Sequence, residues 1–327
     1  MDFRTTLPVQ STEFLLTHAD QVMILGSCFA ENIGLQLKES GFRVSLNPFG
    51  VLYNPASVGM ALHRLWHNQP FREEELVEND GFYHSFSHHS SFSGTDPKIT
   101  LDTINKSFKE AVTSLQNTTC LIITFGTSWV YTLPSTDQIV ANCHKLPDDN
   151  FLRRRLSINE IEYFYMELLE MLFQEKPDLK VLFTVSPIRH LKDGLHENIL
   201  SKSTLHLAID GLCESFDNVY YFPAYELMMD DLRDYRFYAE DMVHPSATAQ
   251  RYIWDHFTDT FFSKPTKEMV RQVQQIRKAM EHKPFHPEDE SYKRFAKKNI
   301  ATIELLSVNA PELDLSEERT FFEKILH

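Results

Sequence analysis

The chain has 327 residues, of which 42% are hydrophobic, 12% aromatic and 24% charged, a composition typical of folded globular proteins. Lys and Arg number 32 against 46 Asp and Glu, and the net charge of −14 argues against nucleic acid or an anionic membrane as partner. The sequence begins without a basic segment followed by an apolar one, and no apolar run reaches the ~18–20 residues of a membrane span. We therefore expect a cytoplasmic protein.

Short apolar runs alternate with helical patterns along the first 263 residues. Strands are predicted at residues 22–25, 42–46, 120–125, 180–185 and 219–222. Helices are predicted after residue 28 and at about 104–116, 158–175, 197–216 and 246–262. This alternation indicates a doubly wound α/β fold, a three-layer αβα sandwich on a parallel sheet of the flavodoxin-like kind. In such sheets, ligands bind at the carboxyl ends of the strands.

Two regions depart from the alternation. Residues 63–100 are polar and aromatic, and we interpret them as a lid-like insertion in the α/β domain of residues 1–263. Residues 264–327 form a second, charged region with a helical repeat and no catalytic signature. We expect this helical extension to serve in docking or in homo-oligomer formation.

Gly26-Ser27 stands at the junction of the first strand and the first helix. A serine at this turn presents its hydroxyl at the edge of the sheet, where the N–H groups of the first helical turn face a developing oxyanion. Serine is also a favoured helix N-cap, and that simpler role accounts for most Gly-Ser pairs before a helix.

Asp241-x-x-His244 follows the last predicted strand. This spacing lets one loop supply a histidine base and a carboxylate that orients its imidazole, as in serine hydrolases with the chain order Ser…Asp…His. A capped surface loop is the alternative. A nucleophile-like turn and a base-like loop at the two ends of one α/β unit favour the catalytic interpretation.

Gly26-Ser27-Cys28-Phe29-Ala30 spells the signature of the GSCFA family, which resembles a branch of the SGNH (GDSL-like) hydrolases. The resemblance covers about residues 20–262, and the blocks at Gly26-Ser27, Gly50, Gly126 and Asp241-x-x-His244 occur in the expected order. It implies Ser27 as nucleophile, His244 as base and Asp241 as its orienting carboxylate. It also implies the backbone N–H groups of Ser27 and Gly50 as oxyanion donors.

The third block departs from the SGNH pattern. It reads Gly126-Thr127-Ser128, where the superfamily has G-x-N and uses the Asn side chain as an oxyanion donor. Loss of one such donor costs on the order of 10²–10³ in rate. We expect Gly126 and Thr127 to complete the oxyanion hole, with Ser128 or Asn142 as alternative donors.

Two further clusters are predicted to line the substrate pocket. Asn142 and His144 form the first, and Arg189 and His190 follow the strand at 180–185. Arg189 is suited to a carboxylate or phosphate of a substrate. A structural ion pair for Arg189, and hydrogen-bonded structural roles for His144 and His190, are the alternatives.

Cys28 adjoins the predicted nucleophile, at the start of the helix. A thiol there is a second candidate nucleophile, but consecutive helical residues point about 100° apart, so we expect Cys28 to face away from the site. His84, His88 and His89 lie in a Ser- and Phe-rich segment without an H-E-x-x-H pattern, and no dinucleotide or P-loop motif occurs. We expect neither a metal nor a cofactor.

These features together predict an SGNH-like serine esterase or acyl hydrolase. The substrate expected is an O-acyl ester of a small polar or carbohydrate-type molecule, cleaved through an acyl-serine intermediate. An acyltransferase using the same site is one alternative. A non-catalytic binding or scaffolding module with a degraded oxyanion hole is the other, and the missing Asn of the third block favours it.

Overall fold

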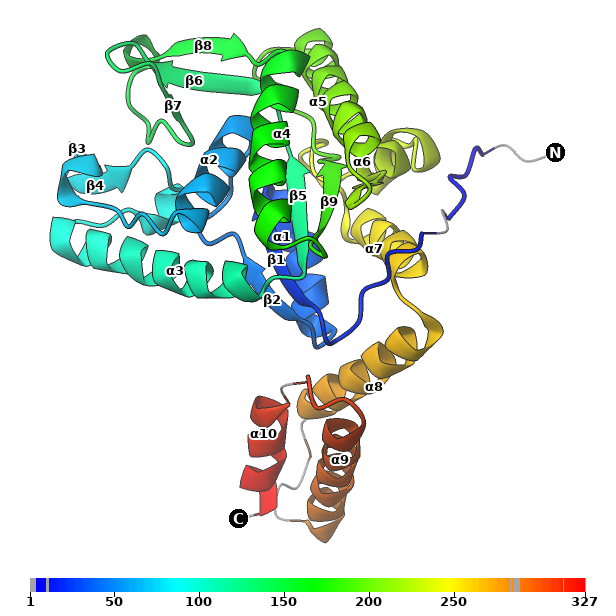
Figure 1. Cartoon of the computed structure of the whole chain (residues 1–327). Helices are drawn as coiled ribbons and strands as arrows, with labels where there is room; N and C mark the ends of the chain where they lie inside the picture. The colour runs from blue at the N-terminus through cyan, green and yellow to red at the C-terminus, as the bar shows by residue number, and fades with distance from the viewer. Residues whose placement is uncertain (1–3, 10–11, 283, 285–288, 314, 327) are drawn as a thin grey trace. The chain divides into compact units, whose positions relative to one another are not determined.

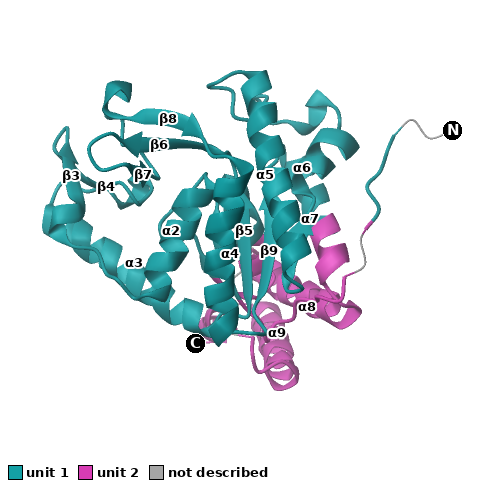
Figure 2. Ribbon diagram, turned by 45° about the horizontal axis from the view of Figure 1, so that its top comes forward, with its two compact units in different colours: residues 1–8, 22–34, 45–255 teal, residues 9–21, 35–44, 256–327 magenta. Residues whose placement is uncertain are grey.

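The computed structural model describes residues 4–9, 12–282, 284, 289–313 and 315–326 of the chain (Figure 1). Its contacts define two compact units, coloured separately in Figure 2. Unit 1 comprises residues 1–8, 22–34 and 45–255, and unit 2 comprises residues 9–21, 35–44 and 256–327. This division differs from the predicted boundary at residue 263, because residues 9–21 and 35–44 belong to unit 2.

The central sheet has five strands in the order β10-β9-β5-β1-β2. Their bounds are β1 Gln21–Gly26, β2 Arg43–Leu46, β5 Cys120–Phe125, β9 Lys180–Val185 and β10 Val219–Phe222. The β1–β5, β5–β9 and β9–β10 pairs are parallel. Counted along the chain, these five strands lie in the flavodoxin-like order 2-1-3-4-5, which confirms the predicted fold. The order reverses between β1 and β5, so the turn at Ser27 lies at the switch point.

Helices cover both faces of the sheet. On one face, the alternate residues Met23 and Leu25 of β1 share a buried apolar cluster with four helices. These are α2 (Pro55–Trp66), α3 (Pro97–Asn117), α4 (Ile158–Glu175) and α5 (Leu195–Ser215). On the other face, Gly34 of α1 (Cys28–Glu39) lies against Ile24, and Asn32 of α1 donates to Gln250 of α7 (Ala247–Phe261). The result is the three-layer arrangement that the sequence predicts.

Two small antiparallel sheets were not predicted. The hairpin of β3 (Leu76–Asn79) and β4 (Phe82–Ser85) follows α2, and a three-stranded sheet in the order β7-β6-β8 follows β5. Its strands are β6 Trp129–Leu133, β7 Gln138–Val140 and β8 Leu152–Arg155. The remaining short elements are η1 Glu73–Glu75, η2 Ser90–Phe92, η3 Asp148–Asn150, α6 Ala224–Glu226, η4 Leu227–Asp231 and η5 Tyr235–Phe237.

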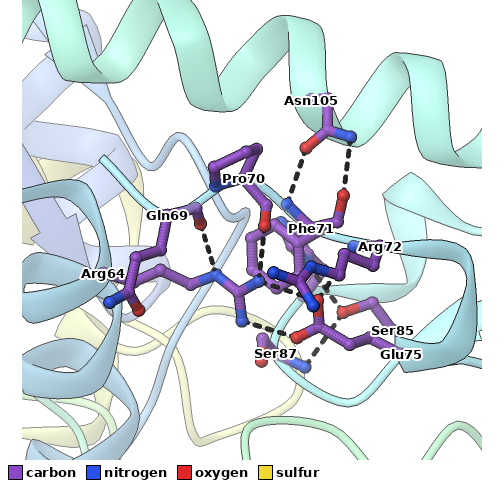
Figure 3. Close-up of polar contacts among 10 residues, drawn as sticks. Arg64, Gln69, Pro70, Phe71, Arg72, Glu75, Ser85, Ser87 and Asn105 are labelled. Carbon is purple, nitrogen blue, oxygen red and sulfur yellow. Dashed lines mark hydrogen bonds and ion pairs between the residues drawn. The ribbon is translucent and has the colours of Figure 1, made fainter. Parts of the chain in front are cut away.

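The first insertion, residues 67–96, is fixed to α2 and α3 by polar contacts (Figure 3). The guanidinium of Arg64 donates to both carboxylate oxygens of Glu75, at 2.6 and 2.8 Å, and lies 3.5 Å from the centre of the Phe71 ring. The side chain of Asn105 in α3 pairs with the backbone N–H and carbonyl of Phe71, at 2.9 and 3.0 Å. These bidentate contacts hold the start of the insertion in one place.

Unit 2 contains three C-terminal helices, α8 (Lys264–Met280), α9 (Glu290–Asn309) and α10 (Ser316–Leu326). They share an apolar cluster that includes Val273, Ile303 and Phe322, and Arg277 of α8 donates to Glu318 of α10 at 2.7 Å. This confirms the predicted helical region after residue 264. Among the described residues of both units, no helix is long and apolar enough to cross a membrane.

Candidate active site

The turn between β1 and α1 is fixed by close backbone contacts. Gly26 has a φ of +145°, and a Cβ at this position would lie 2.2 Å from the carbonyl oxygen of Thr124, so only glycine fits here. Its N–H donates to Oδ1 of Asn47 and its carbonyl accepts the N–H of Leu52, both at 2.9 Å. The backbone that carries Ser27 is therefore held against β5 and against the segment that follows β2.

Ser27 is 1% exposed, and its Oγ has no hydrogen-bond partner among the described residues. Its carbonyl accepts the N–H of Ala30 at 2.8 Å, which begins α1, but its hydroxyl caps no N–H group of that helix. A buried hydroxyl without a partner costs about 1–3 kcal/mol. The side-chain capping that would explain a Gly-Ser pair by itself is therefore absent here.

The loop from Ala239 to His244 contains the predicted base. Nδ1 of His244 lies 2.6 Å from Oδ2 of Asp241, whose Oδ1 accepts the N–H groups of Val243 and His244, both at 2.9 Å. These backbone N–H groups, together with the His244 ring, lower the pKa of Asp241 to about 2. An ionised carboxylate can only accept, so in this contact Nδ1 of His244 is the donor. The sequence prediction that Asp241 orients His244 thus matches the geometry.

Ser27 and His244 line the same cavity of about 420 Å³. The cavity lies at the carboxyl ends of β1, β5 and β9, with β6 and β8 forming one wall. Its other lining residues are Cys28, Tyr53, Asn54, Thr127, Trp129, Tyr131, Val140, Ala141, Arg153, Ser186, Ile188, Arg189, His190, Leu191, Lys192, Asp193 and Val243. Ser27 Oγ and His244 are not hydrogen-bonded. The hydroxyl is buried, whereas the His244 side chain is 47% exposed.

The predicted oxyanion donors require correction. The N–H of Gly50 donates to the carbonyl of Asn47 at 2.7 Å, and Gly50 does not line the cavity. The N–H groups of Gly126 and Thr127 both donate to the carbonyl of Tyr53, at 2.8 and 3.0 Å. The N–H of Ser27 itself faces Thr124 O at 3.3 Å. All four backbone donors are engaged within the protein.

The hydroxyls of the third block are engaged as well. Thr127 Oγ1 lies 3.0 Å from Ser201 Oγ in α5, and Ser128 Oγ donates to the same oxygen at 3.1 Å. This cluster packs the loop after β5 onto α5. Neither hydroxyl takes the place of the missing Asn.

Asn54 is a cavity residue that the sequence analysis missed. It is 5% exposed and caps α2, because its Oδ1 accepts the N–H of Ser57 at 2.8 Å. This bond fixes the amide plane, and no described residue accepts from its Nδ2 group. An Asn before Pro-x-Ser predicts only a helix N-cap. Asn54, with its Oδ1 engaged in this cap, therefore lines the same cavity as Ser27.

His190 lies beside the candidate nucleophile. A Cβ at Gly126 would be 3.4 Å from Nε2 of His190 and 3.5 Å from Cβ of Ser27, so both side chains lie close to Gly126. Burial, aided by the charges of Lys202 and Arg153, lowers the pKa of His190 to about 4. The ring is thus neutral at physiological pH.

Arg189 links two loops of the cavity. Its Nη2 donates to the carbonyl of Met242 at 2.9 Å, and its guanidinium lies 4.7 Å from the centre of the Tyr238 ring. Met242 has a φ of +59°, a left-handed conformation that is uncommon for its residue type. Arg189 therefore anchors the strained loop that carries Asp241 and His244 to the end of β9.

Asn142 and His144 lie elsewhere, contrary to the prediction that they line the pocket. Asn142 donates to Ser90 Oγ at 3.1 Å and accepts the N–H of His144, whose Nε2 lies 2.8 Å from the carbonyl of Ser85. Neither residue lines the cavity around Ser27. Both have structural partners in the first insertion.

The predicted lid also requires correction. None of residues 63–100 lines the cavity, and the wall comes instead from the β7-β6-β8 sheet. Short antiparallel strands such as residues 129–133 have only a weak alternation of buried and exposed positions. They were missed beside the continuous apolar run of β5. The insertion that lines the cavity is the one between β5 and α4, which contains β6, β7 and β8.

Cys28 lines the cavity beside Ser27, but its surroundings oppose a thiolate. Burial raises the pKa of the Cys28 thiol, and the Tyr53 hydroxyl is its hydrogen-bond partner. A nucleophilic cysteine requires the opposite shift. Among the described residues, no group of three or more His, Cys, Asp or Glu side chains is placed to hold a metal ion.

Lys202 of α5 lies beneath the site, fully buried. Its Nζ donates to the carbonyls of Gly126 and Ser186, both at 2.7 Å, and so ties together the loops that follow β5 and β9. Burial lowers its pKa to about 7. Nothing in the sequence marks Lys202 as buried, because a lysine on a helix is normally exposed.

The comparisons with known proteins identify a family. The model of the GSCFA family matches residues 21–257, and that of the GSCFA domain protein, C-terminal domain, matches residues 273–327. The first match contains every residue of the cavity. A search of curated proteins gave no match.

Proposed function

The chain belongs to the GSCFA family, and from this premise and the geometry of its cavity we propose that it is a serine esterase of the SGNH type. Ser27 is the nucleophile, His244 the general base, and Asp241 the carboxylate that orients the base. The observation that carries the proposal is a single cavity lined by an unpartnered, buried serine hydroxyl and by a histidine already oriented by an ionised aspartate.

In the first step, Ser27 Oγ attacks the ester carbonyl while Nε2 of His244 takes the hydroxyl proton. The imidazolium that forms is stabilised by Asp241, which stays ionised because its pKa is about 2. His244 then returns the proton to the leaving alcohol, and an acyl-serine results. Water, deprotonated by the same histidine, attacks the acyl-serine and releases the acid and the free Ser27 hydroxyl.

The oxyanion of each tetrahedral intermediate needs donors that are not already engaged. The N–H of Ala30 is engaged by the carbonyl of Ser27, so the N–H groups of Cys28 and Phe29 are the proposed backbone donors. The positive end of the helix favours negative charge there. Asn54 Nδ2 supplies a side-chain donor that performs the role of the absent third-block Asn. Removal of a donor of this kind reduces kcat by about 10²–10³.

The reaction also requires Ser27 and His244 to meet. Catalytic hydrogen bonds are often long in the absence of substrate and form in the complex. In this protein the exposed Asp241–His244 loop is the part that moves, because the Ser27 turn is held by backbone bonds from two other segments. Substrate in the cavity draws the loop inward and brings Nε2 of His244 to Ser27 Oγ.

The substrate proposed is an O-acyl ester of a small polar or carbohydrate-type molecule. Volumes of 300–1,000 Å³ are typical of small-molecule sites, and this cavity of about 420 Å³ combines polar groups with the rings of Tyr53, Trp129 and Tyr131. Transfer of the acyl group to an acceptor hydroxyl uses the same residues. Analysis of the products in the presence of sugar acceptors distinguishes transfer from hydrolysis.

Turnover of 4-nitrophenyl acetate by the full chain and by single variants tests the proposal. We expect Ser27→Ala and His244→Ala each to reduce kcat by at least about 10³, because either change removes the nucleophile–base pair. Cys28→Ala, the neighbouring control, keeps turnover within about threefold of the unchanged protein. Loss of activity in Cys28→Ala with activity retained in Ser27→Ala contradicts the proposal.

A non-catalytic binding module is the second candidate. It is favoured by the separation of the buried Ser27 hydroxyl from the exposed His244 ring and by the engaged N–H groups of Gly50 and Gly126. It predicts equal background turnover in the unchanged protein, Ser27→Ala and His244→Ala. The same assay therefore decides between the two functions.

A further inference from the structure

The cavity around Ser27 has a charge opposite to that of the chain. Arg153, Arg189 and Lys192 line it, and Asp193 is the one acidic side chain among its described lining residues. The sequence as a whole carries a net charge of −14. A local excess of positive charge in an acidic protein is therefore a feature of this site and not of the composition.

Arg153 is held in a fixed position in the wall. Its guanidinium donates to both carboxylate oxygens of Asp193 and lies 4.6 Å from the centre of the Trp129 ring and 5.1 Å from that of Tyr131. This pairing neutralises Asp193. The charges of Arg189 and Lys192 are left without a carboxylate among the cavity residues.

Unpartnered buried N–H donors belong to three of the lining residues. Nε of Arg153, Nε of Arg189 and Nε1 of Trp129 are all buried and have no acceptor among the described residues. These three groups can only donate, so an acceptor brought in by a ligand is what satisfies them. The same cavity contains no unpartnered carboxylate to attract a cation.

Lys192 extends the positive surface outward. Its side chain is 59% exposed, and its Nζ donates to the hydroxyl of Tyr131 at 2.8 Å, which directs the ammonium along the β6 wall. Asp148 lies 3.5 Å from the same ammonium, outside the cavity lining. Lys192 thus combines access to solvent with a fixed direction.

We propose, on the basis of the serine-esterase function above, that the ester substrate carries a carboxylate and that Arg153, Arg189 and Lys192 bind this group beside Ser27. Guanidinium groups match the planar, two-oxygen geometry of a carboxylate, and the exposed ammonium steers it to the cavity. The acid group lies on the acyl or on the alcohol part of the ester. Either way, charge gives the site its selectivity.

A matched pair of esters tests this inference. 4-Nitrophenyl hydrogen adipate carries a carboxylate, and 4-nitrophenyl methyl adipate has the same chain without the charge. A second pair, an acetyl ester of a carboxy-nitrophenol and its methyl ester, places the charge on the alcohol part. In at least one pair we expect kcat/KM to be about tenfold or more higher for the anionic ester, with a preference that falls as salt is added.

Lys192→Gln provides the site-directed test. We expect it to reduce kcat/KM for the anionic ester about three- to fivefold relative to that for the neutral ester, because the lost charge acts on the carboxylate. Lys109→Gln removes the same charge from the exposed side of α3, outside the cavity, and is expected to leave the preference intact. Equal turnover of both members in both pairs, unaffected by Lys192→Gln, overturns the inference and leaves the esterase function standing.

Binding to the inactive Ser27→Ala variant separates the two proposals further. By calorimetry we expect adipate to bind at least about tenfold more tightly than uncharged adipamide. Preferential adipate binding without turnover of any ester by the unchanged protein rejects the esterase and supports the anion site. Equal binding of adipate and adipamide counts against the anion site.

Discussion

The two halves of the candidate active site are held in different ways. The half that carries Ser27 is buried and tied by backbone contacts to Thr124, Asn47 and Leu52. The half that carries His244 is exposed and is organised mainly by its own Asp241, with Arg189 as its anchor to the rest of the cavity. Ser27 is thus positioned by the fold, whereas His244 is positioned by one short loop.

This difference indicates where adjustment occurs. Moving Ser27 requires several backbone hydrogen bonds to break, but moving His244 requires only the loop from residue 239 to 244 to shift about its anchor. The local hydrogen bonds within this loop, including Ala239 N–H to His244 O at 2.8 Å, allow it to move as a unit. The orientation of His244 by Asp241 then survives the motion.

The largest effect is expected from a change in the fixed half. Gly26→Ala places a methyl group 2.2 Å from the carbonyl oxygen of Thr124 at a φ of +145°, so β1 and β5 must separate at the switch point. We expect the free energy of unfolding, measured in urea, to fall by at least about 3 kcal/mol.

Gly81→Ala is the matched control. Gly81 also has a positive φ, +75°, but a Cβ there meets nothing within 4 Å. Only backbone strain is introduced, and we expect a loss of about 1 kcal/mol. Equal losses in the two variants would show that the close approach to Thr124 does not constrain the Ser27 turn.

An intermediate effect is expected at His190, which burial keeps neutral. Its pKa of about 4 lies below the ordinary 6.5, mainly because it is buried. Between pH 6.5 and 4 the unfolded chain binds a proton that the folded chain does not, so the free energy of unfolding falls as the pH decreases. His190→Gln should make this fall shallower, by about 2.5 kcal/mol over that pH range.

Urea unfolding of both proteins at several pH values measures this difference. His88 and His206, whose pKa values burial also lowers, to about 3 and about 4, are present in both proteins and cancel in the comparison. Identical pH dependences would mean that the ring of His190 is charged in the folded protein.

The smallest effect is expected in the exposed half, which carries His244. Arg189→Gln removes the bond to Met242 O and the contact with the Tyr238 ring, so the His244 loop loses its anchor. We expect kcat/KM for a neutral ester to fall about tenfold, which corresponds to about 1.4 kcal/mol. Stability should change little, because the loop is exposed.

Arg233→Gln, which removes the same charge from a neighbouring exposed position, is the control and should leave kcat/KM unaltered. If both variants turn over the neutral ester like the unchanged protein, the anchor has no part in positioning His244.

The central strands β1, β5 and β9 were predictable because they are buried on both faces. Such strands read as continuous apolar runs, and the predicted strand at 120–125 and helix at 158–175 have the bounds observed for β5 and α4. The β3–β4 and β7-β6-β8 sheets were missed because their strands are partly exposed and include polar residues such as Glu78, Gln138 and Arg153. They therefore lack the continuous apolar run that marks a buried strand.

The contact between Asp241 and His244 was predictable because their spacing places both side chains on one loop. The oxyanion donors were not, because whether the N–H of Gly50 is free depends on a turn that pairs it with Asn47. Asn54 carries a signal for a helix cap, and only its place in the cavity shows a second use. Lys202 was invisible because its burial depends on the packing of α5.

Covalent labelling tests the central claim most directly. The full chain is treated with a fluorophosphonate, and the modified residue is located by peptide mass spectrometry in the unchanged protein, Ser27→Ala, Cys28→Ala and His244→Ala. We expect an adduct on Ser27 that persists in Cys28→Ala and disappears in His244→Ala. An adduct on another residue, or labelling of Ser27 that is equally fast without His244, would contradict it.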